Sequence, residues 1–202
     1  MNAEKLREMF NGSYVEDEGP AGYARHFLRH LFGSHIEDTK QFLELRFISS
    51  NHILQKFYGG VDEVLRDWGY IENLQAREYN VHYGVCPRVR KSGKITDVSH
   101  AVALWADVDY YKGQEDRRAC FERLTAFKPR PSVIVSSGGG FHCYWSIPIT
   151  EVSEKLKNTL RGLQRAVGSD SVHDFSRVMR LPGTLNLKNE NKKEVKVVWY
   201  SS

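Results

Sequence analysis

Two acidic residues stand one position apart at the end of the apolar segment Val102-Ala-Leu-Trp-Ala-Asp107-Val-Asp109. Side chains alternate between the two faces of a strand, so in a strand both acids point the same way, with Cα atoms roughly 6.6–6.8 Å apart. Two such carboxylates bind hard cations like Mg²⁺ or Mn²⁺, which prefer oxygen ligands and leave positions open for phosphate. The alternative is a strand that ends in a solvated turn, because short acidic motifs also arise by chance. The segment therefore predicts a divalent metal site.

A glycine turn follows in the stretch Ser136-Ser-Gly-Gly-Gly140-Phe-His142. Its backbone N–H groups, together with the hydroxyls of Ser136 and Ser137 and the His142 imidazole, are suited to holding a triphosphate. The stretch is not a P-loop, since no Gly-Lys-Ser/Thr ends it, and a Rossmann fingerprint is also absent. The alternative is a plain glycine hairpin in which His142 faces solvent.

A third segment combines acids for a metal with bases for phosphate. Asp170 and Asp174 are followed by Arg177, Arg180 and Lys188. Arginine binds phosphate through a planar pair of donors, and lysine acts as a point charge. The turn at Pro182-Gly183 lets Lys188 return beside the two arginines. The alternative is an ordinary turn with a rim of exposed charges.

The elements that must position these residues form a mixed pattern of helices and strands. The periodicity predicts helices at 2–10, 21–33, 61–68, 115–127 and from a Thr150 cap to about 166, and strands at 42–48, 79–85, 101–109, 132–137, 141–147 and 195–200. From residue 101 onward the order is typical of an α+β fold with a ferredoxin-like or RRM-like catalytic sheet and helices on one face. We expect a mainly helical N-terminal α/β module, 1–75, packed against a core, 76–202, in contiguous layers.

Composition narrows the class of protein. The 202 residues are 41% hydrophobic and carry a net charge of +4, which is compatible with nucleic acid but does not require it. No run of 18 apolar residues occurs, and the N-terminal segment is charged and amphipathic, so we expect a cytoplasmic protein without a membrane partner. The three cysteines, Cys86, Cys120 and Cys143, form no Cys-x-x-Cys pair and are expected to be reduced.

Taken in order, the three segments resemble motifs I, II and III of the archaeo-eukaryotic primase superfamily, particularly its primase-polymerase branch. The resemblance covers about residues 79–190 and implies that Asp107, Asp109 and Asp170 hold two Mg²⁺ or Mn²⁺ ions. Asp174 competes with Asp170 as the third carboxylate. His142 matches the histidine that contacts the phosphates of the incoming nucleotide. The usual second motif is Ser-x-His, and the glycine at position 140 shifts the phosphate contact to Ser136, Ser137 or backbone N–H groups.

The stretch 80–88 is similar to a strand before motif I in plasmid, phage and CRISPR-associated primase-polymerases. It contains Tyr83, a candidate for sugar contact, and it leads into the basic cluster Arg88, Arg90, Lys91 and Lys94, the candidate template contact. The alternative for this cluster is a solvated loop.

The leading hypothesis is a nucleotidyltransferase that adds nucleotides to the 3′-hydroxyl of a nucleic acid. A wider form of this hypothesis adds the joining of two nucleotides to begin a primer. Its substrates would be nucleoside triphosphates and single-stranded or primed DNA, and its larger relatives carry helicase or accessory domains. Two alternatives use the same residues differently. A noncatalytic module would bind single strands on an RRM-like sheet, and a two-metal nuclease would activate water at the same acids.

Overall fold

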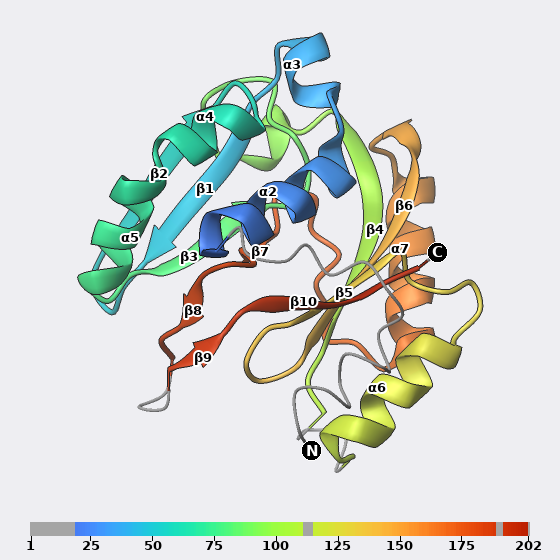
Figure 1. Ribbon diagram of the computed structural model, residues 1–202. Coiled ribbons are helices and arrows are strands. Elements are labelled where there is room, and N and C mark those ends of the chain that lie inside the picture. The colour runs from blue at the N-terminus through green and yellow to red at the C-terminus, as the bar shows by residue number, and fades with distance from the viewer. Residues whose placement is uncertain (1–18, 111–114, 189–191, 202) are drawn as a thin grey trace.

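The computed structural model describes residues 19–110, 115–188 and 192–201, and it confirms the α+β class (Figure 1). The helix expected at 2–10 lies outside the described residues. Two four-stranded sheets dominate the chain. The first sheet has the order β2-β1-β3-β7 with every neighbouring pair antiparallel, and its strands are β1 (Leu43–Ile48), β2 (Ile53–Tyr58), β3 (Asn80–Gly84) and β7 (Val178–Arg180).

The second sheet carries the predicted metal and glycine motifs. It has the order β10-β5-β6-β4 and consists of β4 (His100–Val108), β5 (Val133–Ser136), β6 (Phe141–Glu151) and β10 (Lys196–Tyr200). β6 lies between β4 and β5, which is the arrangement of a ferredoxin-like unit. The strand that follows the second helix of that unit, β7, joins the first sheet instead. A short pair, β8 (Leu185–Asn186) and β9 (Lys193–Glu194), lies beside the start of β3.

Helices cover both faces of the second sheet. The helices of the described residues are α2 (Gly19–Phe32), α3 (His35–Thr39), α4 (Val61–Arg66), α5 (Trp68–Ala76), the 3₁₀ turn η1 (Ile95–Asp97), α6 (Arg117–Ala126) and α7 (Glu154–Val167), of which α4 and α5 contact the first sheet. α6 and α7 pack on the face that presents Ala106 and Cys143. α2 packs on the other face, where the Phe27 ring lies 5.2 Å from Tyr83 in β3 and 5.4 Å from Tyr144 in β6. α2 therefore joins the two sheets (Figure 1).

The structure corrects the predicted start of α7. Thr150 does not cap the helix but pairs with Ala101 inside β6, which runs on to Glu151. The cap is Ser153, whose side chain accepts a hydrogen bond from the N–H of Leu156. Pairing with β4 extends the strand beyond its apolar stretch, and local sequence does not carry that information. The helix expected at 61–68 ends at Arg66, and a second helix begins at Trp68.

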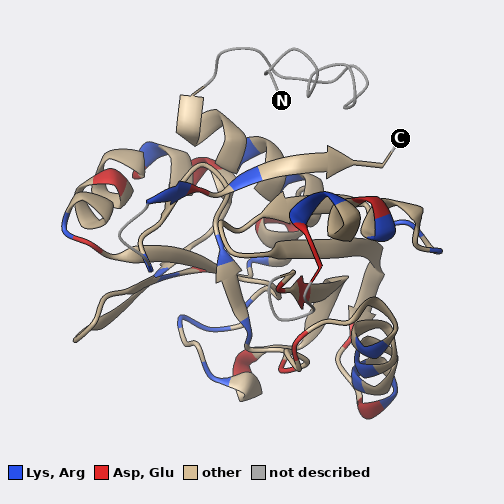
Figure 2. Cartoon of the chain, turned by 90° about the horizontal axis from the view of Figure 1, so that it is seen from below, with Lys and Arg blue, Asp and Glu red and all other residues tan. Residues whose placement is uncertain are grey.

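The boundary at residue 75 stays a prediction, and the first sheet contains strands from both sides of it. β1 pairs with β3 from Leu45 opposite Tyr83 to Ile48 opposite Asn80. All three cysteines are buried and free. Among the described helices, none combines the length and the apolar character needed to cross a membrane. Figure 2 shows basic and acidic residues interspersed over the described elements. The charge around a given site therefore depends on the residues close to it rather than on the net charge of the chain.

Candidate active site

Asp107 and His142 lie side by side on neighbouring strands of the second sheet. They are register partners on β4 and β6, and the Nε2 of His142 lies 3.7 Å from Oδ1 of Asp107. His142 is buried, so the alternative of a solvent-facing histidine is wrong. Burial, together with the positive charges of Arg180 and Arg177, lowers the pKa of His142 to about 3, so the imidazole is neutral near pH 7.

The end of α7 brings Asp170 next to Asp107. The helix ends at Gly168, which adopts φ +70°, a conformation that glycine reaches without strain. Ser169 then accepts a hydrogen bond through Oγ from the N–H of Asp107 (2.9 Å). The N–H of Asp170 donates to the carbonyl oxygen of Asp107 (2.9 Å). Ser169 was not among the residues predicted from the sequence, because nothing local marks a serine that supports a distant strand.

Asp107 lies among charges of both signs. Burial and the negative charges of Asp109 and Asp170 raise the pKa of Asp107 to about 6, against the opposing effect of Arg177 and Arg180. The Nη2 of Arg177 lies 3.6 Å from Oδ2 of Asp107. Around Asp107 of β4 the structure thus gathers Asp109 just after that strand, Asp170 just after α7, and Arg177 and Arg180 before and at the end of β7.

His82 also lies close to this cluster of charged residues, and the sequence analysis did not assign it to the site. It lies on β3 directly opposite Arg180 of β7. Burial, together with the positive charge of Arg180, lowers the pKa of His82 to about 3, so it is also neutral near pH 7. Its position in the stretch 80–88 was the only signal available, and the candidates predicted from that stretch were Tyr83 and Arg88.

The glycine turn lies directly against the acidic pair. Gly138 has φ +90°, and the N–H of Ser137 donates to the carbonyl oxygen of Gly140 (3.0 Å). A Cβ on Gly140 would lie 2.4 Å from the carbonyl oxygen of Val108 and 2.8 Å from Oδ1 of Asp109. Position 140 therefore has no room for the serine of the usual second motif. Ser136 and Ser137 are both buried, and their contact with phosphate stays a prediction.

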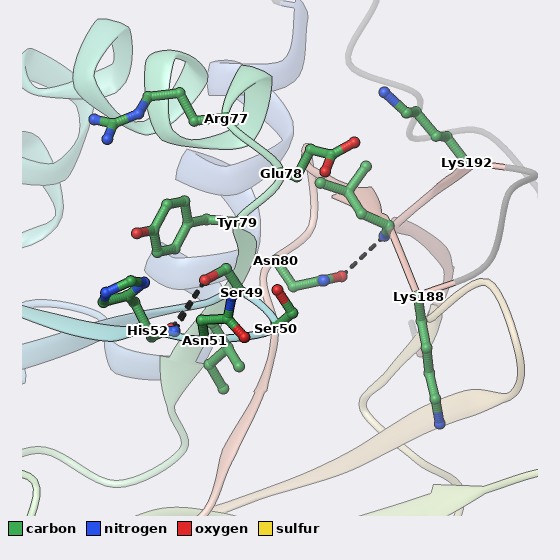
Figure 3. A pocket seen from close by; sticks show the side chains of 12 residues that line it. Ser49, Ser50, Asn51, His52, Arg77, Glu78, Tyr79, Asn80, Lys188 and Lys192 are labelled. Carbon is green, nitrogen blue, oxygen red and sulfur yellow. Dashed lines mark hydrogen bonds between the residues drawn. The ribbon is translucent and has the colours of Figure 1, made fainter.

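Two other predicted residues lie away from Asp107. Asp174 is exposed and accepts a hydrogen bond from the N–H of Ser176 (2.9 Å), so Asp170 rather than Asp174 lies next to the acidic pair. Lys188 is exposed and lines an open pocket of about 910 Å³ near the start of β3 (Figure 3). In that view its side chain extends away from Lys192, and its contact with a triphosphate stays a prediction.

The structure corrects two of the predicted sugar and template contacts. Tyr83 is fully buried between Phe27 and Phe32, so it offers no surface to a sugar. Arg88 is fully buried in an ion pair with Glu44. In both cases the sequence showed a residue type suited to nucleic acid, but burial depends on elements distant in the chain. The other three basic residues of the cluster, Arg90, Lys91 and Lys94, are exposed as expected.

The acids around Asp107 do not form a compact set of metal ligands. Within the part of the chain that the structure describes, no three His, Cys, Asp or Glu side chains stand close enough together to hold a metal ion. The donors are carboxylate oxygens, and their mutual repulsion raises the pKa of Asp107. Carboxylates that repel one another fit a hard divalent cation, and Mg²⁺ commonly takes one or two carboxylates and completes its shell with phosphate and water.

Comparisons with known proteins show the family and the fold. The family model for the RepB DNA-primase N-terminal domain matches residues 80–200, more than half of the chain. No curated protein matches the sequence. Three solved structures share the fold at 13–17% identity.

The primase-polymerase domain of cyanophage S-2L has a TM-score of 0.58 and 17% identity, with 84% of this chain and 88% of that chain covered. The catalytic domain of primase RepB′ in complex with initiator DNA has a TM-score of 0.60 and 13% identity, with 89% and 84% covered. A second RepB′ structure has a TM-score of 0.62 at 13% identity, and 88% of this chain spans 55% of its length.

Proposed function

The chain belongs to the RepB DNA-primase family, and we propose that it is a primase-polymerase that extends a 3′-hydroxyl along a DNA template. The proposal includes the start of a primer by joining two nucleotides. The substrates are nucleoside triphosphates and single-stranded or primed DNA. Family membership supports the primase activity, and the site supports the finer claims as follows.

The single observation that carries the proposal is the meeting of acids and arginines around Asp107. Asp109 and Asp170 act on this carboxyl together with Arg177 and Arg180. A site for phosphoryl transfer needs acids for divalent ions and cations for the triphosphate, in one place. The names of two similar structures support the polymerase and DNA parts: one is a primase-polymerase domain, and another was solved with initiator DNA.

Asp107, Asp109 and Asp170 are the residues that would hold Mg²⁺ or Mn²⁺. When bound, two such ions activate the attacking hydroxyl and stabilise the leaving pyrophosphate. The protein supplies position and charge. Arg177 and Arg180 neutralise the triphosphate as negative charge moves onto the leaving group, and a buried site strengthens this effect. His142 is neutral, so it contacts phosphate through one N–H without adding a charge.

Arg90, Lys91 and Lys94 form the exposed basic loop on which we place the template strand. Arg90 is 76% exposed even though it pairs with Asp97 at 2.8 Å. Its neighbour Lys91 lies over the ring of Phe42, 5.4 Å from the centroid. Phosphate contacts from such a loop bind single strands without reading their sequence.

Primer extension with a labelled primer tests the proposal. We expect that Asp107→Ala combined with Asp109→Ala abolishes extension but leaves the fold and most DNA binding intact. Removing the acids deletes the ion site and relieves carboxylate repulsion, so the apo fold loses no stability. The matched control replaces two exposed acids, Glu122→Ala with Glu154→Ala, and keeps full extension.

Each result has a separate meaning in this assay. Extension by the folded acidic-pair variant would refute the assignment of the acids. Shortening of the primer by the wild type would support a nuclease, and a gel shift with neither extension nor shortening would support a noncatalytic binding module.

A further inference from the structure

A buried ion pair connects strand β1 to the segment that carries Arg177. Glu44 and Arg88 both have fully buried side chains, and the Nη2 of Arg88 lies 2.7 Å from Oε2 of Glu44. The Nε of Arg88 donates to the same oxygen at 2.8 Å. The other carboxylate oxygen, Oε1, accepts from Arg46 at 2.6 Å and from Gln55 at 2.8 Å. Both oxygens of the Glu44 carboxylate therefore accept hydrogen bonds.

The remaining donors of Arg88 hold backbone just before Arg177. Nη1 donates to the carbonyl oxygen of Phe175 (3.3 Å), and Nη2 donates to that of Ser176 (3.0 Å). The carbonyl oxygen of Arg177 itself accepts from the N–H of Val85, on the chain that leads to Arg88 (3.1 Å). The side chain of Arg177 then reaches to 3.6 Å from Asp107. A continuous series of contacts thus runs from Glu44 through Arg88 to Arg177.

From these contacts we propose that Arg88, held by Glu44, is a positioning residue that sets Arg177 for contact with the triphosphate of the nucleotide. The inference rests on the proposed function, because it takes Arg177 as a phosphate-binding residue. Arg88 acts through the backbone of residues 175 and 176 and does not itself touch substrate.

The chemistry of the pair favours this role over simple packing. A buried ion pair is often no more stable than apolar residues of the same volume, so stability alone does not account for it. Guanidinium offers five donors in a fixed fork and satisfies one carboxylate and two carbonyls at once, which an ammonium group does not reproduce. Space around the pair is also restricted: a Cβ on Gly84 would lie 2.9 Å from Nη2 of Arg88.

The test is a double-mutant cycle read by binding. Anisotropy of a fluorescent, non-hydrolysable nucleoside triphosphate, at fixed Mg²⁺, gives the dissociation constant without any turnover. Arg177→Ala is expected to weaken binding roughly 10-fold or more, the loss of a charged hydrogen bond. Arg88→Lys is expected to weaken it at least about threefold in the wild-type background and less than about twofold when Arg177 is already alanine, because coupled residues are not additive.

Two further variants separate positioning from loss of fold. Glu44→Gln with Arg88→Met removes both buried charges, leaves only the partly exposed Arg46 without its carboxylate partner, and should match the cycle result of Arg88→Lys. Tyr58→Phe removes a 2.6 Å hydrogen bond from β2 to Asp67, at the opposite edge of the first sheet from β7, and should leave nucleotide binding unchanged. Thermal unfolding of every variant shows that it is folded at the assay temperature.

The outcomes distinguish the inference from the proposed function. Equal weakening by Arg88→Lys in both backgrounds would overturn the positioning role, and so would unchanged binding in the wild-type background while Arg177→Ala binds weakly. Unchanged binding by Arg177→Ala would instead refute its assignment to the triphosphate, and the positioning role would fall with it.

Discussion

Asp107 is the residue on which the opposing charges of the site act together. Its carboxyl is close to Arg177 and His142, and its pKa responds to two acids and two arginines. Burial and repulsion outweigh the arginines, because the pKa rises from 3.8 to about 6. The metal-free site therefore holds a proton more tightly than an exposed aspartate does. This makes the protein's stability depend on pH in a definite direction.

We predict that metal-free wild type loses stability relative to Asp107→Asn as pH rises from about 4 to 7. In this window the unfolded chain releases the proton at its ordinary pKa, while the folded chain keeps it up to about pH 6. The difference between the two proteins should grow to roughly 2–3 kcal/mol in favour of the variant. Urea unfolding in EDTA at several pH values measures it.

Adding Mg²⁺ or Mn²⁺ is the companion measurement. A cation bound at the acids replaces the proton, so it should stabilise the wild type at pH 7 and leave Asp107→Asn nearly unchanged. Stability curves that stay parallel over the whole pH range would show that Asp107 titrates normally.

For His142→Ala we expect kcat/KM for the nucleotide to fall roughly 10- to 150-fold, with a smaller effect on DNA binding. The range corresponds to about 1.5–3 kcal/mol for a hydrogen bond to a charged group. Tyr144→Phe, two residues along the same face of β6, is the matched control and should stay within about twofold. Steady-state kinetics over a nucleotide series checks both, and an unchanged kcat/KM in His142→Ala would show that this histidine is structural.

At the scale of single residues, the local sequence pattern identified candidate residues better than it predicted their burial. The sequence singled out both Asp107 and His142, and the structure shows that they are register partners on neighbouring strands. The family resemblance is also confirmed. Tyr83 and Arg88 were assigned wrongly because their burial depends on α2 and β1, which lie far away in the sequence.

Among the elements, the glycine turn between β5 and β6 packs closely against the acidic pair. Gly140 lies against the backbone of Val108 and the carboxylate of Asp109, where any side chain would collide. The turn therefore fixes the second acid of the pair as well as the hairpin. This explains in physical terms why position 140 departs from the Ser-x-His pattern.

We predict that Gly140→Ala lowers primer extension at least about 10-fold without unfolding the protein, because Asp109 must move away from the new methyl group. Gly162→Ala is the matched control: it lies in α7 with open space around its Cβ position. That change should keep full activity and raise stability by roughly 0.5–1 kcal/mol. Equal extension by the two variants would contradict the crowding argument.

Periodicity in the sequence predicted the positions of helices and strands where contacts with other elements of the chain did not change their limits. β1, β3, β4, β5 and α6 lie within two residues of the predicted ranges. β2 was missed because its sequence is largely exposed and shows no buried face. The two-residue strands β8 and β9 were also beyond prediction, since tertiary contacts rather than propensity define them.

Across the whole molecule, one buried cluster includes both sheets and α2. It contains Phe27 and Leu45 from the first 75 residues, together with Tyr83, Trp105 and Tyr144 from the rest. Contiguous layers were expected because the sequence shows no linker, and the division of the chain at residue 75 stays a prediction. A cluster shared in this way makes the two regions depend on each other for stability.

We therefore predict that residues 76–202, produced alone, fail to unfold cooperatively, whereas the full chain shows a single transition. In the fragment β3 loses its neighbour β1 and becomes an exposed edge, and Tyr83 loses Phe27. Far-UV and near-UV circular dichroism during urea unfolding measure the two proteins side by side. Co-expression with residues 1–75 should restore the transition, because it returns the missing half of the cluster. If the fragment alone keeps near-UV signal and a sharp transition, then the catalytic sheet is stable by itself, and α2 serves only to attach the first sheet.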